Sequence, residues 1–179
     1  MTWQGEIMER GYVQVYTGDG KGKTTAVLGL AVRAAGAGLR VFIAQFVKGA
    51  EYSEIKALQR FTDLITLKQY GRGCFIHQKA AEEDIRLATA GLAEVEDMML
   101  SGEYQMIILD EVNIATHFAL FPVERVLELV GKKPVGVELV LTGRRADHRV
   151  IEAADLVTEM REIKHYYQQG VAAREGIEK

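Results

Sequence analysis

The sequence has 179 residues, of which 48% are hydrophobic and 26% charged, with a formal net charge of −3 at pH 7. These values predict a single domain, 1–179, that buries its own core. The acidic balance argues against a nucleic-acid partner, and no apolar run is long enough to span a membrane. Residues 1–10 lack a signal-peptide pattern and are expected to form a flexible segment, so we expect a cytoplasmic protein. The single Cys74 excludes an internal disulfide and any multi-cysteine metal site.

Strand-like and helix-like segments alternate along the chain. Strands are predicted over 12–16, 40–46, 64–67, 106–109, 137–142 and 156–159, and helices over 23–35, 53–61, 80–101, 123–130 and 149–154. This alternation predicts an α/β fold of three layers, like that of P-loop NTPases: a mainly parallel sheet with helices on both faces.

The most informative feature is a glycine-rich loop between the first predicted strand and the first predicted helix. It reads Thr17-Gly18-Asp19-Gly20-Lys21-Gly22-Lys23-Thr24-Thr25. Backbone N–H groups and the helix N-terminus converge on phosphate oxygens in such a loop. Lys23 supplies a cation, and Thr24 offers a hydroxyl to bound Mg²⁺. The usual G-x-x-x-x-G-K-[ST] pattern has glycine where this chain has Thr17, and Lys21 adds a second cation. The loop therefore predicts that a nucleoside triphosphate binds here.

Two further turns are predicted to reach the same edge of the sheet. The apolar strand 106–109 runs directly into Asp110 and Glu111. A buried strand can deliver a carboxylate beside the phosphate loop of a neighbouring strand, where it would hold Mg²⁺ directly or through water. The turn 142–145 follows another apolar strand, so Arg144 is a candidate phosphate contact. A surface turn with an exposed arginine is an equally good explanation of this segment.

The histidines and the loop 71–77 carry weaker signals. The four histidines show no zinc-ligand spacing, which favours surface or packing roles. The loop places Cys74, Phe75 and His77 between weak elements. Exposed apolar residues there could form the wall of a site for a planar ligand, although ordinary anchoring of the loop is the simpler explanation.

Taken together, these motifs resemble the ATP:corrinoid adenosyltransferases of the CobA/CobO/BtuR type, which make adenosylcobalamin. The form Gly20-Lys21-Gly22-Lys23-Thr24-Thr25, the turn Thr142-Gly143-Arg144 and the run 154–160 are its most specific parts. The segments that carry the resemblance span nearly the whole chain: 17–25, 33–36, 45–49, 108–111, 141–144, 154–160, 164–165 and 170–178.

The resemblance implies an unusual use of ATP. In this family, Co(I) of a reduced corrinoid attacks the 5′ carbon of the ribose, and triphosphate leaves. Lys21 and Lys23 would then be the catalytic cations, because negative charge collects on the departing triphosphate. Arg33 and Arg144 join the loop residues as ATP contacts, and Thr24, Asp110 and Glu111 are the expected Mg²⁺ ligands.

The resemblance also implies how the corrinoid is bound and which partners take part. Phe75 falls where the family places corrin-contacting aromatics, and His77 would line the same pocket without binding cobalt. The family's most familiar form has a Trp close to this Phe in the same loop, and the loop of this chain has none. A homodimer and a reductase that supplies Co(I) are the expected partners.

Two other functions fit parts of the pattern. A small P-loop kinase or ATPase would use Lys23, Thr24 and Asp110 in their usual roles, with Arg144 or Arg145 stabilising charge. A nucleotide-dependent binding module is the third possibility, against which the acidic balance and small size of the chain count.

Overall fold

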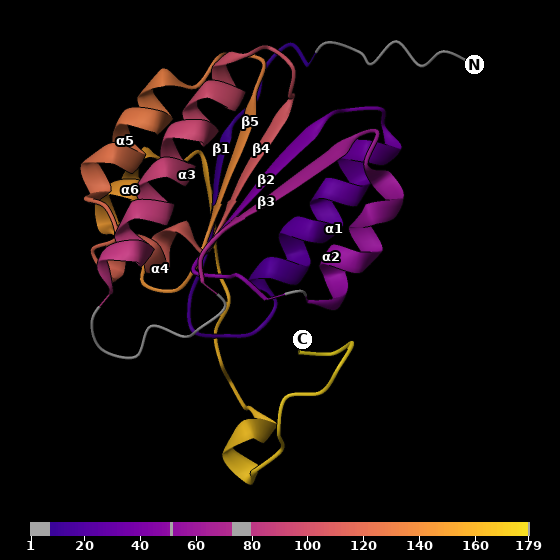
Figure 1. Cartoon of the computed structure of the whole chain (residues 1–179), viewed down its shortest axis with the longest axis vertical. Coiled ribbons are helices and arrows are strands. Elements are labelled where there is room, and N and C mark those ends of the chain that lie inside the picture. Colours follow the sequence, from indigo (N-terminus) through magenta and orange to yellow (C-terminus); the bar gives the residue numbers. More distant parts are fainter. Residues whose placement is uncertain (1–7, 51, 73–79, 179) are drawn as a thin grey trace.

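The computed structural model describes residues 8–50, 52–72 and 80–178 (Figure 1). Cys74, Phe75 and His77 therefore lie outside the described residues, as does most of the segment 1–10 for which flexibility was expected. None of the helices in these three ranges combines the length and apolar character that a bilayer crossing needs.

One sheet of six parallel strands forms the centre of the molecule, in the order β3-β2-β4-β5-β1-β6. The register pairs Val15 of β1 with Leu141 of β5, and Ile43 of β2 with Ile108 of β4. The strands are β1 (Val13–Thr17), β2 (Val41–Phe46), β3 (Ile65–Tyr70), β4 (Met106–Asp110), β5 (Glu138–Thr142) and β6 (Leu156–Glu159).

Helices cover both faces of this sheet, which confirms the predicted α/β fold (Figure 1). On one face lie α1 (Lys23–Gly36) and α2 (Ser53–Leu58), which continues into a 3₁₀ turn (Gln59–Phe61). On the other face lie α3 (Glu82–Leu100), α4 (Val112–His117), α5 (Val123–Lys132) and α6 (His148–Ala153). Each predicted strand and helix is confirmed with small shifts of its ends. Two short elements were not predicted, α4 and a 3₁₀ turn (Tyr166–Gln169).

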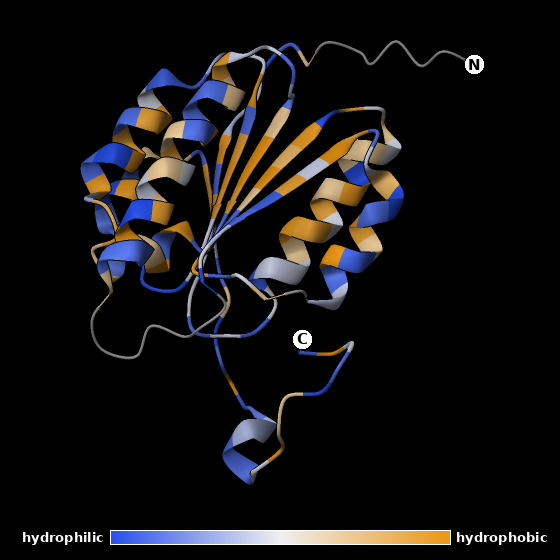
Figure 2. Ribbon diagram, viewed as in Figure 1, coloured by the Kyte–Doolittle hydropathy of each residue, from blue (hydrophilic) through white to orange (hydrophobic). Residues whose placement is uncertain are grey.

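The strands are apolar on both sides because each side packs against helices. Along β4, Ile107 and Leu109 belong to the core under α3 and α5, whereas Met106 and Ile108 belong to the core under α1. This burial on both faces explains why the central strands read as continuous apolar runs. Figure 2 shows them as mostly hydrophobic strands between helices in which hydrophobic and hydrophilic residues alternate.

The strand order corrects one expectation. The acidic strand β4 is not the neighbour of the phosphate-loop strand β1, because β5 lies between them. Helix α1 crosses over β5 and β4 on its way from β1 to β2, and it contacts all three of these later strands. The first turn of α1 therefore lies close enough to β4 for Thr24 to contact Asp110. The carboxylate is brought to the loop by the crossing helix rather than by strand pairing.

Candidate nucleotide site

The phosphate loop joins the carboxyl end of β1 to the first turn of α1. Two backbone hydrogen bonds fasten it to the chain that follows β6: Gly20 N donates to Met160 O at 2.7 Å, and Met160 N donates to Thr17 O at 2.8 Å. A Cβ atom on Gly20 would lie 2.6 Å from Met160 O, so the loop requires glycine there. Gly22, the residue before α1, has a φ of 116°, which favours glycine as well.

Lys23 lies inside this loop. Its Nζ donates to Gly18 O at 2.6 Å and to Gly20 O at 2.7 Å, and the residue is 6% exposed. Burial lowers the pKa of Lys23, and the positive charge of Arg144 lowers it further against the opposing charge of Glu111. The sequence-predicted cation is therefore held at the loop, beside the backbone that would surround a phosphate.

Asp110 is the centre of the hydrogen-bond network at this edge of the sheet. Its carboxylate is completely buried and accepts from Thr142 Oγ1 at 2.7 Å and from Thr24 Oγ1 at 3.0 Å. Gln45 Nε2 donates to it at 3.2 Å, and Lys48 Nζ at 2.8 Å. The four donors come from β5, α1, β2 and the turn after β2. Because each donor has its own element, the carboxylate is held in one position.

Lys48 and Gln45 are site residues that the sequence-based prediction missed. Burial by itself lowers the pKa of Lys48, but the charge of Asp110 and its hydrogen bond outweigh burial and raise it. The lysine therefore stays charged beside the buried carboxylate. A signal was available in the sequence: Lys48 follows the carboxyl end of a buried strand, as Asp110 and Arg144 do.

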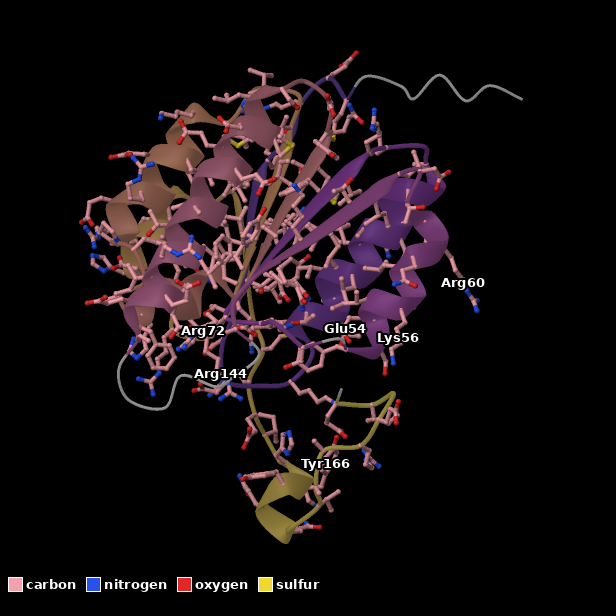
Figure 3. The ribbon with its side chains drawn as sticks, in the orientation of Figure 1. Glu54, Lys56, Arg60, Arg72, Arg144 and Tyr166 are labelled. Atoms are coloured by element: carbon pink, nitrogen blue, oxygen red, sulfur yellow. The ribbon has the colours of Figure 1, made fainter. Side chains whose placement is uncertain are left out.

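Glu111 and Arg144 also lie at this edge of the sheet. Glu111 has a φ of 63° at the start of α4, and its N–H donates to Thr142 Oγ1 at 2.9 Å. Burial raises the pKa of Glu111, and the adjacent charge of Asp110 raises it further. Arg144 is exposed, and its charge acts on both Glu111 and Lys23. Figure 3 shows it at the end of the sheet that faces the segment carrying Tyr166.

The oxygens at this point fit Mg²⁺. Thr24 Oγ1 and the Asp110 carboxylate lie 3.0 Å apart and are hard ligands of the kind that Mg²⁺ prefers. Within the described ranges no group of three or more His, Cys, Asp or Glu side chains could hold a metal. Mg²⁺ is commonly bound through one or two carboxylates together with substrate phosphates and water. A site of this kind agrees with the residues present, and the set Thr24, Asp110 and Glu111 stays a prediction.

Lys21 has a different environment from Lys23. Its Nζ donates to Ile177 O at 2.9 Å and to Glu178 Oε1 at 3.0 Å, and Tyr166 OH lies at 3.5 Å. Glu178 is the largest cause of the raised pKa of Lys21. The second cation of the loop therefore joins the phosphate loop to the end of the chain.

The remaining predicted ATP contacts differ in burial and in their distance from the loop. Thr17 is buried, and its hydroxyl accepts from Ala146 N at 3.3 Å. Asp19 and Thr25 are exposed. Arg33 is exposed in the last turn of α1, about 15 Å from Lys23 at the helical rise of 1.5 Å per residue. The structure does not bring Arg33 to the loop, because the body of α1 separates the two ends.

The glycine loop and the carboxylate that meets its first helical turn place the chain among the P-loop nucleotide-binding α/β proteins. The family can be named more closely. The model of the ATP:corrinoid adenosyltransferase BtuR/CobO/CobP family matches residues 9–178, and the chain belongs to this family of transferases.

Curated relatives agree with the family match. A corrinoid adenosyltransferase of Pseudomonas aeruginosa is 34% identical over 95% of this chain and 84% of the relative. One from a Sinorhizobium species is 35% identical over 95% and 81%. The corrinoid adenosyltransferase CobA of Salmonella typhimurium is 32% identical over 95% and 86%.

Family membership weighs against both alternatives, phosphoryl transfer and a non-enzymatic module. The geometry adds a detail about Arg145, an arginine considered for phosphoryl transfer. Its Nη1 lies 3.1 Å from His117 Nε2 at the end of α4, and its backbone φ is 57°.

Proposed function

We propose that this protein transfers the 5′-deoxyadenosyl group of ATP to Co(I) of a corrinoid and releases triphosphate. The acceptor class covers cobalamin, cobinamide and cobyrinic acid a,c-diamide. The cobalt electron pair forms the Co–C bond, and the pair of the breaking C5′–O bond leaves with the triphosphate. The observation that carries this proposal is the phosphate loop with its internal lysine, in a chain that belongs to the corrinoid adenosyltransferases.

The residues of the loop would act on the leaving group. Negative charge grows on the triphosphate oxygen as the C5′–O bond breaks, so cations and N–H groups around it stabilise the transition state more than the ground state. Lys23 and the first N–H groups of α1 supply such groups, and Lys21 and Arg144 add positive charge at the rim of the loop. A bound Mg²⁺ would supply further charge neutralisation on the phosphates.

The proposed reaction demands no general base, because the attacking cobalt carries its own electron pair and no proton is removed. This agrees with the environment of Asp110, which already accepts four hydrogen bonds, one of them from an ammonium group. These contacts hold the carboxylate in one position beside the loop, and no step of the proposed reaction asks it to accept a proton.

Three further parts of the proposal follow from the resemblance. Phe75 and His77 would contact the corrin, two copies of the chain would form a homodimer, and a reductase would supply Co(I). Mixing labelled partner copies and measuring the mass in solution tests the dimer without regard to catalysis.

Product analysis tests the reaction itself. With ATP, Mg²⁺, a strong reductant and hydroxocobalamin, we expect triphosphate and a light-sensitive corrinoid with a Co–C bond. Release of ADP or orthophosphate without an alkylated corrinoid would contradict the proposal and favour a kinase or ATPase.

Lys23→Ala should lower kcat/KM by about 10²- to 10³-fold, the usual effect of removing one group that stabilises developing charge. The matched control is Lys56→Ala, which removes an exposed lysine from α2 (Figure 3). It should leave kcat/KM unchanged. Equal effects of the two variants would mean that Lys23 has no special role at the triphosphate.

A further inference from the structure

The Lys48 ammonium group contacts the hydroxyl of Thr24 and the carboxylate of Asp110, the two groups whose oxygens fit a divalent ion. Its Nζ is 2.8 Å from Asp110 Oδ2 and 3.1 Å from Thr24 Oγ1. The Lys48 side chain is 17% exposed and that of Asp110 is 0% exposed. The ion pair is therefore largely buried and is not an exposed surface pair. The ammonium group fills the corner between the first turn of α1 and the end of β4.

The residue before Lys48 has an unusual backbone conformation. Val47 has a φ of 62°, a conformation that is unusual for any residue with a side chain and rarest for a β-branched one. Such outliers persist where the surrounding structure enforces them, and they gather at functional sites. The turn that carries Lys48 to the carboxylate therefore contains a strained residue.

An ammonium group and a divalent ion cannot share these oxygens. Mg²⁺ would approach them at about 2.1 Å, which puts it within a few ångströms of the lysine nitrogen. Like charges at that separation repel strongly in a partly buried site. The lysine stem is flexible and its head is a compact charge, so the head can move to another anion nearby. Phosphate oxygens bound at the adjacent loop are such an anion.

We propose that Lys48 is a triphosphate-binding residue whose ammonium group competes with the divalent ion for Thr24 and Asp110 and moves to the phosphates when the ion binds. In both positions the buried Asp110 carboxylate has one cationic partner, so its charge is never left uncompensated. The proposal rests on the proposed use of Mg²⁺ and ATP, but it does not depend on adenosyl transfer to a corrinoid.

Lysine acetylation of the unaltered protein, followed by mass spectrometry, tests the movement. Lys48 should be acetylated slowly in the protein alone, faster with Mg²⁺ added, and slowly again with Mg²⁺ and inorganic tripolyphosphate. Lys56, exposed on α2, is the internal control and should react at the same rate throughout. A rate at Lys48 that does not respond to Mg²⁺, or that stays high when tripolyphosphate is added, would overturn the proposal.

Binding measurements on variants test the competition. Lys48→Gln should bind Mn²⁺ about tenfold more tightly than the unaltered protein, and it should bind ATP with Mg²⁺ about tenfold more weakly. Lys56→Gln is the control for both values. Lys48→Arg keeps the positive charge and should gain no Mn²⁺ affinity.

Each outcome decides the question. Unchanged or weaker Mn²⁺ binding by Lys48→Gln overturns the competition, and unchanged ATP binding overturns the contact with triphosphate. Should Lys48→Gln fail to fold, the acetylation rates of the unaltered protein still distinguish a lysine that moves from one that stays in place. A protein that passes both tests but never alkylates a corrinoid would contradict the proposed function alone.

Discussion

Thr142 performs two tasks with one hydroxyl group. It donates to Asp110 Oδ1 at 2.7 Å and accepts from Glu111 N at 2.9 Å, and the residue is completely buried. The first contact helps to hold the carboxylate, and the second satisfies the N–H of a residue with a φ of 63°. A single side chain at the end of β5 thus holds both the Asp110 carboxylate and the backbone of Glu111, the residue that follows β4.

Thr142→Val should therefore destabilise the protein by about 2 kcal/mol, although valine has nearly the same shape. The change removes a hydrogen bond to a charged group and leaves a partly buried N–H without its partner. The free energy of unfolding in urea measures the loss. Thr158→Val, on the exposed edge strand β6, is the matched control and should stay within about 0.5 kcal/mol of the original. Equal values for the two variants would contradict this account of Thr142.

At the scale of residues, the sequence was sufficient where the chemistry is local. Thr24 was predicted from the loop motif, and Asp110 from its place after an apolar strand; their hydroxyl and carboxylate meet at 3.0 Å. Gln45 and Lys48 were missed. The place of Lys48 just after a buried strand could be read from the sequence, but the contacts of both residues with Asp110 depend on β2 lying beside β4. Strand neighbours are set by packing over the whole sheet, and no local pattern in the sequence gives them.

At the scale of elements, the contact between α3 and β3 depends on one glycine. A Cβ atom on Gly91 would lie 2.3 Å from Tyr70 Cγ. The Tyr70 ring cannot easily move, because it is buried and its hydroxyl donates to Glu94 Oε2 at 2.8 Å. The helix can approach the strand closely only because position 91 has no side chain.

Gly91→Ala should destabilise the protein by about 1 to 3 kcal/mol through overpacking, although alanine is the better helix former. The control is Gly29→Ala on α1, where an added Cβ atom meets nothing within 4 Å. That variant should stabilise the protein by up to about 1 kcal/mol. The two effects should have opposite signs in thermal unfolding, and a stabilising Gly91→Ala would show that the contact is loose.

The elements themselves were predictable wherever the apolar period was long or the strand was fully buried. Helix 82–100 is long and has its apolar residues at helical spacing. The strands of the sheet read as apolar runs between turn residues. Helix α4 was missed because its six residues, which follow an acidic pair, are too few to show a helical spacing of apolar residues. The neighbour assigned to β1 was wrong because the crossover of α1 passes over two strands, a distance that loop lengths do not reveal.

At the scale of the whole molecule, the last part of the chain extends beyond the carboxyl edge of the sheet and returns toward the phosphate loop (Figure 1). Its residues are mostly exposed, so little apolar burial holds it. Instead a cluster of polar groups gathers around Glu178, which contacts Arg174, Tyr166 and Lys21. Arg174, followed by Tyr166, holds the pKa of the Glu178 carboxyl far below its ordinary value.

Glu178→Gln should loosen this segment without unfolding the sheet. The change removes the charge that Arg174 and Lys21 share, so amide hydrogen exchange over 163–178 should become several-fold faster while the core strands keep their protection. Glu175→Gln removes an exposed charge from the same segment and serves as the control. Unchanged exchange in Glu178→Gln would mean that the backbone bonds of Met160 to Thr17 and Gly20 suffice to hold the segment. Faster exchange would mean that the charged groups around Glu178 hold the segment. Because Lys21 is one of these groups, the ordering of residues 163–178 would then depend on a cation of the phosphate loop.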